Sequence, residues 1–339
     1  MDTKISPVIL EKAPLILAEI KKASSILLHC HPSPDPDSVG SALAMKFALE
    51  QLGKKATVIK GDSEIPEGFM HFPGAKEIVK KNFFEINLAD YDLFLILDSA
   101  STEQISRFKP VQFPLAIRSV VIDHHATDIG YADLNLVEAS YPAVSQILFE
   151  LFGLWQIKMN MEIATNLFMG IYTDTGGFQY EGVTAKTFEI AAELIKHTPS
   201  ISKTIAVMKN SNKPEYIYMQ GLAFNSVETF FGGKMALSVV SASAIREKGI
   251  PVADVRAGEI SPILNRVSDW EVVGTLFEVE AGKIRASFRT HDSEKYDVSK
   301  LAAALGGGGH KAAAGAILNM PLAEAKNLVV AKAKELYNL

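Results

Sequence analysis

The sequence is poor in several features that mark particular classes of protein. Its 339 residues contain one cysteine, Cys30, so no disulfide can form within the chain, which fits a reducing compartment such as the cytoplasm. No apolar run approaches the roughly 18 residues of a membrane helix, and Asp2, Glu11 and Glu19 argue against a signal peptide. The formal net charge is -5, without the basic footprint expected for long nucleic acid. We therefore expect a cytoplasmic protein that binds neither a membrane nor long duplex nucleic acid. A few positively charged side chains could still hold a small anionic substrate.

Length and composition indicate a globular protein with more than one core. The 339 residues, 48% of them hydrophobic, are enough for two or three domains. Strand and helix patterns alternate through the first half, which predicts an α/β fold whose parallel sheet has helices on both faces. Polar and turn residues interrupt the pattern from Lys196 to Phe224, and from Met235 onward the strands look antiparallel. We expect a catalytic domain at 1–195, a partly helical connector at 196–225, and a smaller α/β domain with a mixed sheet at 226–339.

Individual elements follow from the apolar patterns. The strands expected in the first half are continuous apolar runs at Ser25–Cys30, Lys55–Ile59, Leu93–Leu97 and Ser119–Ile122. The helices expected there lie at 39–52, 143–152 and 162–171. In the second half we expect strands at 236–240, 271–280, 283–289 and 316–318, a tight turn at Ala281–Gly282, and helices at 298–305 and 322–337.

A short proline-rich loop organises the first half of the chain. His31, Asp35 and Asp37 lie in the run His31-Pro32-Ser33-Pro34-Asp35-Pro36-Asp37, between a predicted strand and a predicted helix. Ligands of open α/β sheets bind at this kind of position, outside the carboxyl ends of the strands. A helix start tolerates carboxylates, and capping alone would explain one aspartate. It does not explain a histidine and two aspartates held among three prolines, so we predict a metal site.

Three further polar positions follow apolar elements and should emerge at the same edge of the sheet. Asp98 ends one predicted strand, Asp123 and His124 follow another, and Asp174 follows a predicted helix. Each pair of carboxylates about 4 Å apart costs roughly 4 kcal/mol at an effective dielectric near 20, unless protons or cations neutralise them. Mixed imidazole and carboxylate ligands suit Mn²⁺, Fe²⁺, Co²⁺ or Zn²⁺ better than Mg²⁺. Six ligands are too many for one catalytic ion, and two ions that share a carboxylate fit the count.

These motifs, in this order, resemble those of the DHH phosphoesterase family. The run Gly306-Gly307-Gly308-Gly309-His310-Lys311-Ala312-Ala313-Ala314-Gly315 resembles the signature of that family's associated substrate-binding domain. The resemblance spans residues 25 to 320, and the two-domain layout is most similar to the oligoribonuclease and nucleotide-bisphosphate phosphatase branch. It implies an active site in the cleft between the two domains.

The resemblance also implies roles for individual residues. It places His31, Asp35 and Asp98 on one divalent ion, and Asp37, Asp98, His124 and Asp174 on a second. It implies Mn²⁺ as the metal, with Mg²⁺ or Co²⁺ as alternatives. Asp123 would orient a histidine, and His125 would face the substrate phosphate, either stabilising its charge or protonating the leaving oxygen. His29 has no role in the resemblance and we expect it to be structural.

The second domain should hold the substrate. Consecutive glycines such as Gly307, Gly308 and Gly309 let backbone N–H groups approach an oxyanion closely. His310 and Arg289 could add charge-assisted hydrogen bonds to a terminal phosphate. Arg107 and Arg266 are weaker candidates for the same task. The glycine run has an alternative explanation as a flexible surface loop, and a nucleotide-triphosphate P-loop is disfavoured because no Lys-Ser or Lys-Thr follows it.

The expected function is that of a two-metal phosphodiesterase that hydrolyses short oligoribonucleotides to mononucleotides, with 3′-phosphoadenosine 5′-phosphate as a second substrate. Alternatives with the same chemistry are a cyclic- or linear-dinucleotide phosphodiesterase, a single-strand DNA exonuclease and an inorganic pyrophosphatase. A nucleotide-binding sensor is the alternative without catalysis, but it predicts a broken ligand set. The sequence leaves the oligomeric state open, a homodimer included.

Overall fold

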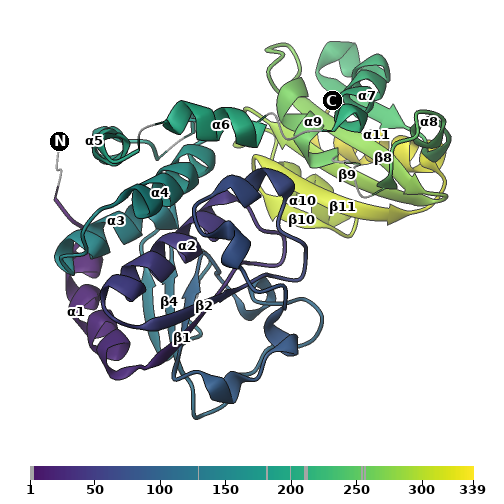
Figure 1. Ribbon diagram of the computed structural model, residues 1–339. Helices are drawn as coiled ribbons and strands as arrows, with labels where there is room; N and C mark the ends of the chain where they lie inside the picture. Colours follow the sequence, from purple (N-terminus) through teal and green to yellow (C-terminus); the bar gives the residue numbers. More distant parts are fainter. Residues whose placement is uncertain are drawn as a thin grey trace. The chain divides into compact units, whose positions relative to one another are not determined.

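The computed structural model describes residues 4–128, 130–180, 182–198, 200–209, 213–252, 255 and 257–339. The chain divides into two compact units, Met1–Ser211 and Asn212–Leu339, which are described one at a time (Figure 1). In the part of the chain that the structure describes, no helix is both long and apolar enough to span a membrane.

The first unit contains a five-stranded parallel sheet with the strand order β2-β1-β3-β4-β5. Its strands are β1 (Ser25–His29), β2 (Lys55–Ile59), β3 (Leu93–Leu97), β4 (Arg118–Asp123) and β5 (Leu134–Val137). Its helices are α1 (Pro7–Lys22), α2 (Pro36–Gln51), α3 (Val144–Leu154), α4 (Met161–Asp174), α5 (Ala185–Lys196) and α6 (Ile201–Lys209). All five strands run in one direction, so their carboxyl ends share one edge of the sheet.

The two faces of this sheet are covered differently, and the prediction of helices on both faces was wrong. One face packs against α1, α2, α3 and α4 around a core that includes Ile26, Leu28 and Leu95. The other face buries Leu27 and Phe94 against turns and short 3-10 segments. Those segments are η3 (Phe83–Glu85), η4 (Leu88–Asp90) and η5 (Thr102–Gln104), whereas η1 (Glu67–His71) and η2 (Ala75–Glu77) lie with the first core, to which Phe69, Phe72 and Ala75 contribute. Prolines, glycines and aspartates punctuate the stretch between β2 and β4, so no long helix begins there.

Local capping sets the start of the helices near the carboxyl edge of the sheet. Asp35 is the N-cap of α2: its Oδ1 accepts a hydrogen bond from the Ser38 N–H at 2.9 Å, and Pro36 occupies the first turn. Asn160 caps α4 in the same way through the Ile163 N–H, also at 2.9 Å. Helix α2 packs closely on α4. A Cβ at Gly40 would lie only 2.5 Å from the Asn166 carbonyl oxygen, so the glycine is what allows this approach.

The second unit contains a six-stranded mixed sheet with the strand order β10-β11-β9-β8-β7-β6. Its strands are β6 (Val227–Phe230), β7 (Met235–Val240), β8 (Val272–Glu280), β9 (Lys283–Thr290), β10 (Gly308–His310) and β11 (Ala313–Asn319). Its helices are α7 (Pro214–Asn225), α8 (Ala242–Glu247), α9 (Ala257–Leu264), α10 (Val298–Ala304) and α11 (Leu322–Tyr337), with the 3-10 segment η6 at Phe231–Gly233.

One pair of strands corrects the antiparallel expectation for this unit. Strands β7 and β8 pair in parallel, with Met235 opposite Val272. The chain between them carries α8 and α9, and a parallel pair needs such a crossover connection. The remaining pairs are antiparallel, and the turn after β8 leads directly into β9 as predicted. The sheet is therefore mixed.

Candidate metal centre

The first group of predicted ligands meets at the carboxyl end of β1. His31 Nε2 lies 3.2 Å from Asp35 Oδ2 and 3.6 Å from Asp98 Oδ2. These three residues offer ligand atoms that all lie within 4.8 Å of one another. Burial alone lowers the pKa of His31, but its contact with the Asp35 carboxylate outweighs burial and the net shift is upward. The three residues that the resemblance assigns to one ion thus lie together.

The second group lies beside the first and meets it at Asp98. Asp37, His124 and Asp174 offer ligand atoms within 4.8 Å of one another. His124 Nε2 lies 3.5 Å from Asp174 Oδ2 and 3.5 Å from Asp98 Oδ1. The two oxygens of Asp98 therefore face different histidines, His31 and His124. A carboxylate in this position can be shared between two cations.

The donor set fits divalent cations. Asp98 Oδ1 and His124 Nε2 are buried and have no hydrogen-bond partner among the residues that the structure describes. Burial raises the pKa of Asp37, and burial together with the charges of Asp37 and Asp98 raises the pKa of Asp174. Asp174 also ends α4, where the helix dipole disfavours negative charge. Bound cations would satisfy the orphaned atoms and neutralise the crowded carboxylates.

His124 is oriented by the main chain. Its Nδ1 donates a hydrogen bond to the Tyr141 carbonyl oxygen at 3.2 Å, which leaves Nε2 facing Asp98 and Asp174. Burial alone lowers the pKa of His124, but the surrounding carboxylates raise it to about 9. A metal ligand must be the neutral imidazole, so cation binding here displaces a proton.

His125 is held by Asp123 and also lies beside the ligand groups: its Nδ1 is 3.7 Å from Asp98 Oδ1, and its ligand atom lies within 4.8 Å of those of Asp98 and His124. The His125 Nδ1 donates to Asp123 Oδ1 at 2.9 Å, and Asp123 is fully buried at the end of β4. This hydrogen bond raises the pKa of the His125 ring, with burial opposing it. The side chain is 37% exposed, so the remaining ring nitrogen is accessible. The histidine that Asp123 orients is therefore His125 rather than the proposed ligand His124.

Asp37 has a structural task besides its place in the ligand group. Its Oδ2 accepts from the Val144 N–H at 2.7 Å and its Oδ1 from the Ser145 N–H at 3.0 Å. These N–H groups open α3, whose N-cap residue makes no side-chain cap. A Cβ at Gly170 would lie 2.3 Å from Asp37 Oδ1, so only glycine leaves room for this carboxylate. Sequence reasoning missed Gly170 and the α3 contact, because neither belongs to a local pattern.

Arg107 lies beside the first ligand group. Its positive charge opposes protonation of His31, and its side chain is exposed. Asp62 accepts from the Arg107 N–H at 2.6 Å and from the Ser106 hydroxyl at 2.7 Å, which fixes this turn after η5. Nothing in the sequence drew attention to Asp62.

The other predicted substrate residues belong to the second unit. Arg289 on β9 and His310 on β10 are both opposite Ala313 of β11, so they occupy one row across the sheet. Arg289 is half-buried and its guanidinium donates to the Phe288 carbonyl at 3.2 Å, whereas His310 is exposed. Arg266 is exposed and lies just after α9, before β8 begins, so it does not belong to that row.

The glycine run is not a loop throughout, which argues against its alternative explanation as a flexible surface loop. Gly308 and Gly309 form the edge strand β10 with His310. A Cβ at Gly307 would lie 2.1 Å from the Gly315 carbonyl oxygen, and a Cβ at Gly309 would lie 2.6 Å from the Ala313 carbonyl oxygen. The glycines therefore permit close pairing with β11, and the strand leaves its outer edge exposed. The cleft expected between the domains stays a prediction.

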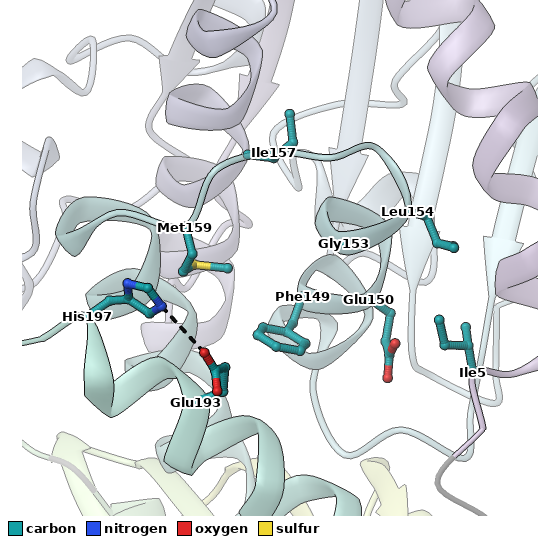
Figure 2. A pocket seen from close by; sticks show the side chains of 9 residues that line it. All are labelled: Ile5, Phe149, Glu150, Gly153, Leu154, Ile157, Met159, Glu193 and His197. Carbon is teal, nitrogen blue, oxygen red and sulfur yellow. Dashed lines mark ion pairs between the residues drawn. The ribbon is translucent and has the colours of Figure 1, made fainter.

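The first unit also contains a cavity of about 460 Å³ that none of the proposed site residues lines. Phe149, Leu154 and Met159 contribute its apolar wall, and Glu193 pairs with His197 at its rim at 3.6 Å (Figure 2).

Two comparisons of the sequence agree with the geometry. The DHH family N-terminal domain matches residues 25–171, and the DHHA1 domain matches residues 232–338. The chain belongs to the DHH family. The first match contains the proposed ligands up to His124, and the second contains Arg289 and His310.

Relatives of this DHH protein are similar over most of their length. The bifunctional oligoribonuclease and PAP phosphatase NrnA of Thermus thermophilus is 28% identical, over 89% of this chain and 87% of the relative. The protein of the same name from Bacillus subtilis is 27% identical, over 89% of this chain and 91% of the relative. An exopolyphosphatase-related protein from Bacteroides fragilis has a similar fold, with a TM-score of 0.84, 21% identity and 97% coverage of both chains.

Proposed function

We propose that this DHH protein is a two-metal phosphodiesterase that releases mononucleotides from short RNA, with 3′-phosphoadenosine 5′-phosphate phosphatase as a second activity. As a DHH phosphoesterase it is a hydrolase of phosphoester bonds. The observation that carries the proposal is the position of Asp98, whose two oxygens face the two ligand groups. The names of the relatives supply the class of substrate.

The proposed metals are two divalent ions, most simply Mn²⁺, with Mg²⁺ or Co²⁺ as alternatives. His31, Asp35 and Asp98 would hold one ion, and Asp37, Asp98, His124 and Asp174 the other. Divalent ions in such a pair lower the pKa of a water toward about 7 and neutralise charge on the phosphoryl oxygens. The mixed donor set favours ions that accept imidazole as readily as carboxylate.

His125 acts on the substrate in this proposal. Asp123 holds its Nδ1, so a proton on Nε2 points away from Asp123 and can be donated. Because the pKa of the ring is raised, this proton stays bound at a higher pH than it would on an ordinary histidine. The proton can stabilise a phosphoryl oxygen or pass to the leaving alkoxide, and general acid help of this kind is typically worth about 10²–10⁴-fold.

The second unit supplies the substrate grip in this proposal. Arg289 and His310 share one row of the sheet beside the exposed glycine strand, which suits a terminal phosphate that accepts hydrogen bonds from both main chain and side chains. Six basic residues against three acids make the segment Lys283–Lys311 locally basic in an acidic chain. Arg107, beside His31, would add positive charge near the metal centre, and Arg266 is the weakest member of the set.

A substrate panel with Mn²⁺ tests the proposal. It contains RNAs of two to five residues, longer RNA and DNA, linear and cyclic dinucleotides, 3′-phosphoadenosine 5′-phosphate and pyrophosphate. We expect the shortest RNAs to be cleaved fastest, because the named oligoribonuclease relatives act on short RNA. Preference for long DNA, for cyclic dinucleotides or for pyrophosphate would replace the proposed substrate with one of those alternatives. Nucleotide binding without turnover would favour a sensor.

A further inference from the structure

Asp98, the residue common to both ligand groups, has an unusual backbone. Its φ is +52°, a left-handed conformation that side chains with a Cβ rarely adopt. It follows β3 directly, and its N–H donates to the Ile122 carbonyl of the neighbouring strand at 3.2 Å. Such a conformation persists only where the surroundings fix it, and it is found most often at functional sites. The question is which residues fix it here.

The peptide groups on the far side of Asp98 are held by a tyrosine and a serine. The Tyr131 hydroxyl donates to the Ser99 carbonyl oxygen at 2.8 Å, from the segment between β4 and β5. The Ser99 hydroxyl, which is fully buried, donates back to the Leu97 carbonyl at 3.1 Å. The next N–H, that of Ala100, donates to Gln104 Oε1 at 3.2 Å. The turn is therefore fixed on both sides of the shared carboxylate.

His29, which the family resemblance left without a role, completes this arrangement. Its Nδ1 donates to the Cys30 carbonyl at 3.1 Å, and its Nε2 lies 3.5 Å from the Ser99 hydroxyl, whose one proton can go to this nitrogen or to the Leu97 carbonyl. The ring packs edge-on against Phe94 at 5.4 Å. Phe113 contacts both Phe94 and Tyr131, with ring centroids 5.9 and 6.4 Å away. The two side chains that reach Ser99, those of His29 and Tyr131, thus pack against the same group of aromatic rings.

We propose that Tyr131 and Ser99, backed by His29, are positioning residues that hold Asp98 in its left-handed turn so that its two oxygens can serve two cations. The inference rests on the metal centre of the proposed function. Among the described residues, the hydrogen bond of Tyr131 goes to Ser99 and its ring contact to Phe113, and neither of these is a proposed ligand, so its effect on the metals should pass through the Asp98 backbone. Its loss should loosen the pairing of the two ions rather than remove a ligand.

The test is Mn²⁺ binding by Tyr131→Phe, measured by calorimetry and by electron paramagnetic resonance, with Tyr91→Phe as the matched control. Phenylalanine keeps the ring contact with Phe113 and removes only the hydroxyl. Tyr91 packs against the same apolar cluster but does not make the hydrogen bond to Ser99 that Tyr131 makes. We expect affinity for the second Mn²⁺ to fall about 10–100-fold, the usual effect of removing a partner behind a metal ligand. The spectrum of a coupled Mn²⁺ pair should give way to that of isolated ions.

A second variant, Ser99→Ala, keeps the inference falsifiable if Tyr131→Phe folds poorly. It removes the hydroxyl contacts with Leu97 and His29 while the main-chain carbonyl remains. Weakened Mn²⁺ pairing in either folded variant, with Tyr91→Phe unchanged, supports the proposal. Mn²⁺ pairing as in the wild type in the folded variants overturns it, as does a wild type that binds no Mn²⁺ pair. Because no nucleotide is used, absence of RNA cleavage would count against the proposed function alone.

Discussion

The catalytic edge of the first unit and the glycine edge of the second are built by opposite means. In the first, charge is buried: Asp37 and Asp98 are 0% and 2% exposed, and the pKa of Asp37 is raised by burial. In the second, the glycine strand is exposed and Arg289 is half-buried. Carboxylates crowded away from water need cations, whereas an exposed strand edge and a guanidinium carry the N–H groups that bind anions. In the proposed function, the chemistry and the substrate grip are divided between these two units of one chain.

Sheet topology explains where each site lies. Parallel strands bring residues that are far apart in the sequence, such as His31, Asp98 and His124, to one carboxyl edge. The antiparallel strands β9, β11 and β10 instead align residues in a row across the sheet, as with Arg289 and His310 on either side of Ala313. The predictions below alter one unit at a time.

The largest effect is expected from Asp98→Ala in the first unit. The variant removes the only carboxylate whose oxygens face both His31 and His124 among the described residues, so turnover of short RNA should be abolished and bound Mn²⁺ reduced. Steady-state hydrolysis and metal analysis of the purified protein measure the two effects. Asp90→Ala, at an exposed aspartate of η4, is the matched control and should behave as the wild type. Turnover that survives in Asp98→Ala would mean that hydrolysis does not take place at this edge of the sheet.

The next largest effect is expected from His125→Ala. The variant should keep its metal, because no proposed ligand is removed, and lose about 10²–10⁴-fold in turnover. Comparing kcat with Mn²⁺ content in the same preparations checks this. Near-normal activity would rule out an essential role for His125 on the substrate.

A smaller effect, confined to nucleotide substrates, is expected from Arg289→Ala in the second unit. Loss of one charge-assisted hydrogen bond costs about 1.5–3 kcal/mol, or roughly 10–150-fold in kcat/KM for dinucleotides. A generic diester without nucleotide contacts should be hydrolysed as before, and Arg246→Ala, at an exposed arginine of α8, should change neither rate. Unchanged dinucleotide turnover in Arg289→Ala would contradict the proposal that the second unit binds the substrate.

The last effect concerns the stability of the metal-free protein and leaves turnover aside. The pKa of Asp174 is raised in the folded state, so the folded chain holds its proton at pH values where the unfolded chain has lost it. The free energy of unfolding should therefore fall as pH rises above about 4, by up to about 1.4 kcal/mol per pH unit for this one group. Asp174→Asn should flatten that slope in urea unfolding curves recorded without metal from pH 5 to pH 8. An identical slope in wild type and variant would mean that the carboxylates do not repel one another as described.

Much of the fold could be predicted because its signals are local. The apolar runs gave β1, β2, β3 and β4 with ends within a residue or two of those observed, and polar residues just after them gave the ligand groups. Strand ends are informative in a parallel sheet, since the side chain that follows a buried run must emerge at the shared edge. This is why His31, Asp98 and His124 could be grouped without a structure.

The remainder depends on contacts that leave no local pattern. The parallel pairing of β7 with β8 depends on a crossover of two short helices, and the 3-10 cover over Phe94 lacks any periodicity. The partners that orient the site are main-chain carbonyls at Tyr141 and Ser99, and a carbonyl has no residue type to recognise. The room that Gly170 leaves for Asp37 is visible only once α4 packs against α2.

The number of divalent ions per active chain tests the central claim most directly. Wild-type protein is freed of metal, titrated with Mn²⁺, and assayed for dinucleotide hydrolysis while bound metal is counted by mass spectrometry. The two ligand groups that meet at Asp98 predict that activity appears with the second bound ion and that fully active protein holds two ions per chain. Full activity with at most one bound ion per chain would contradict the account.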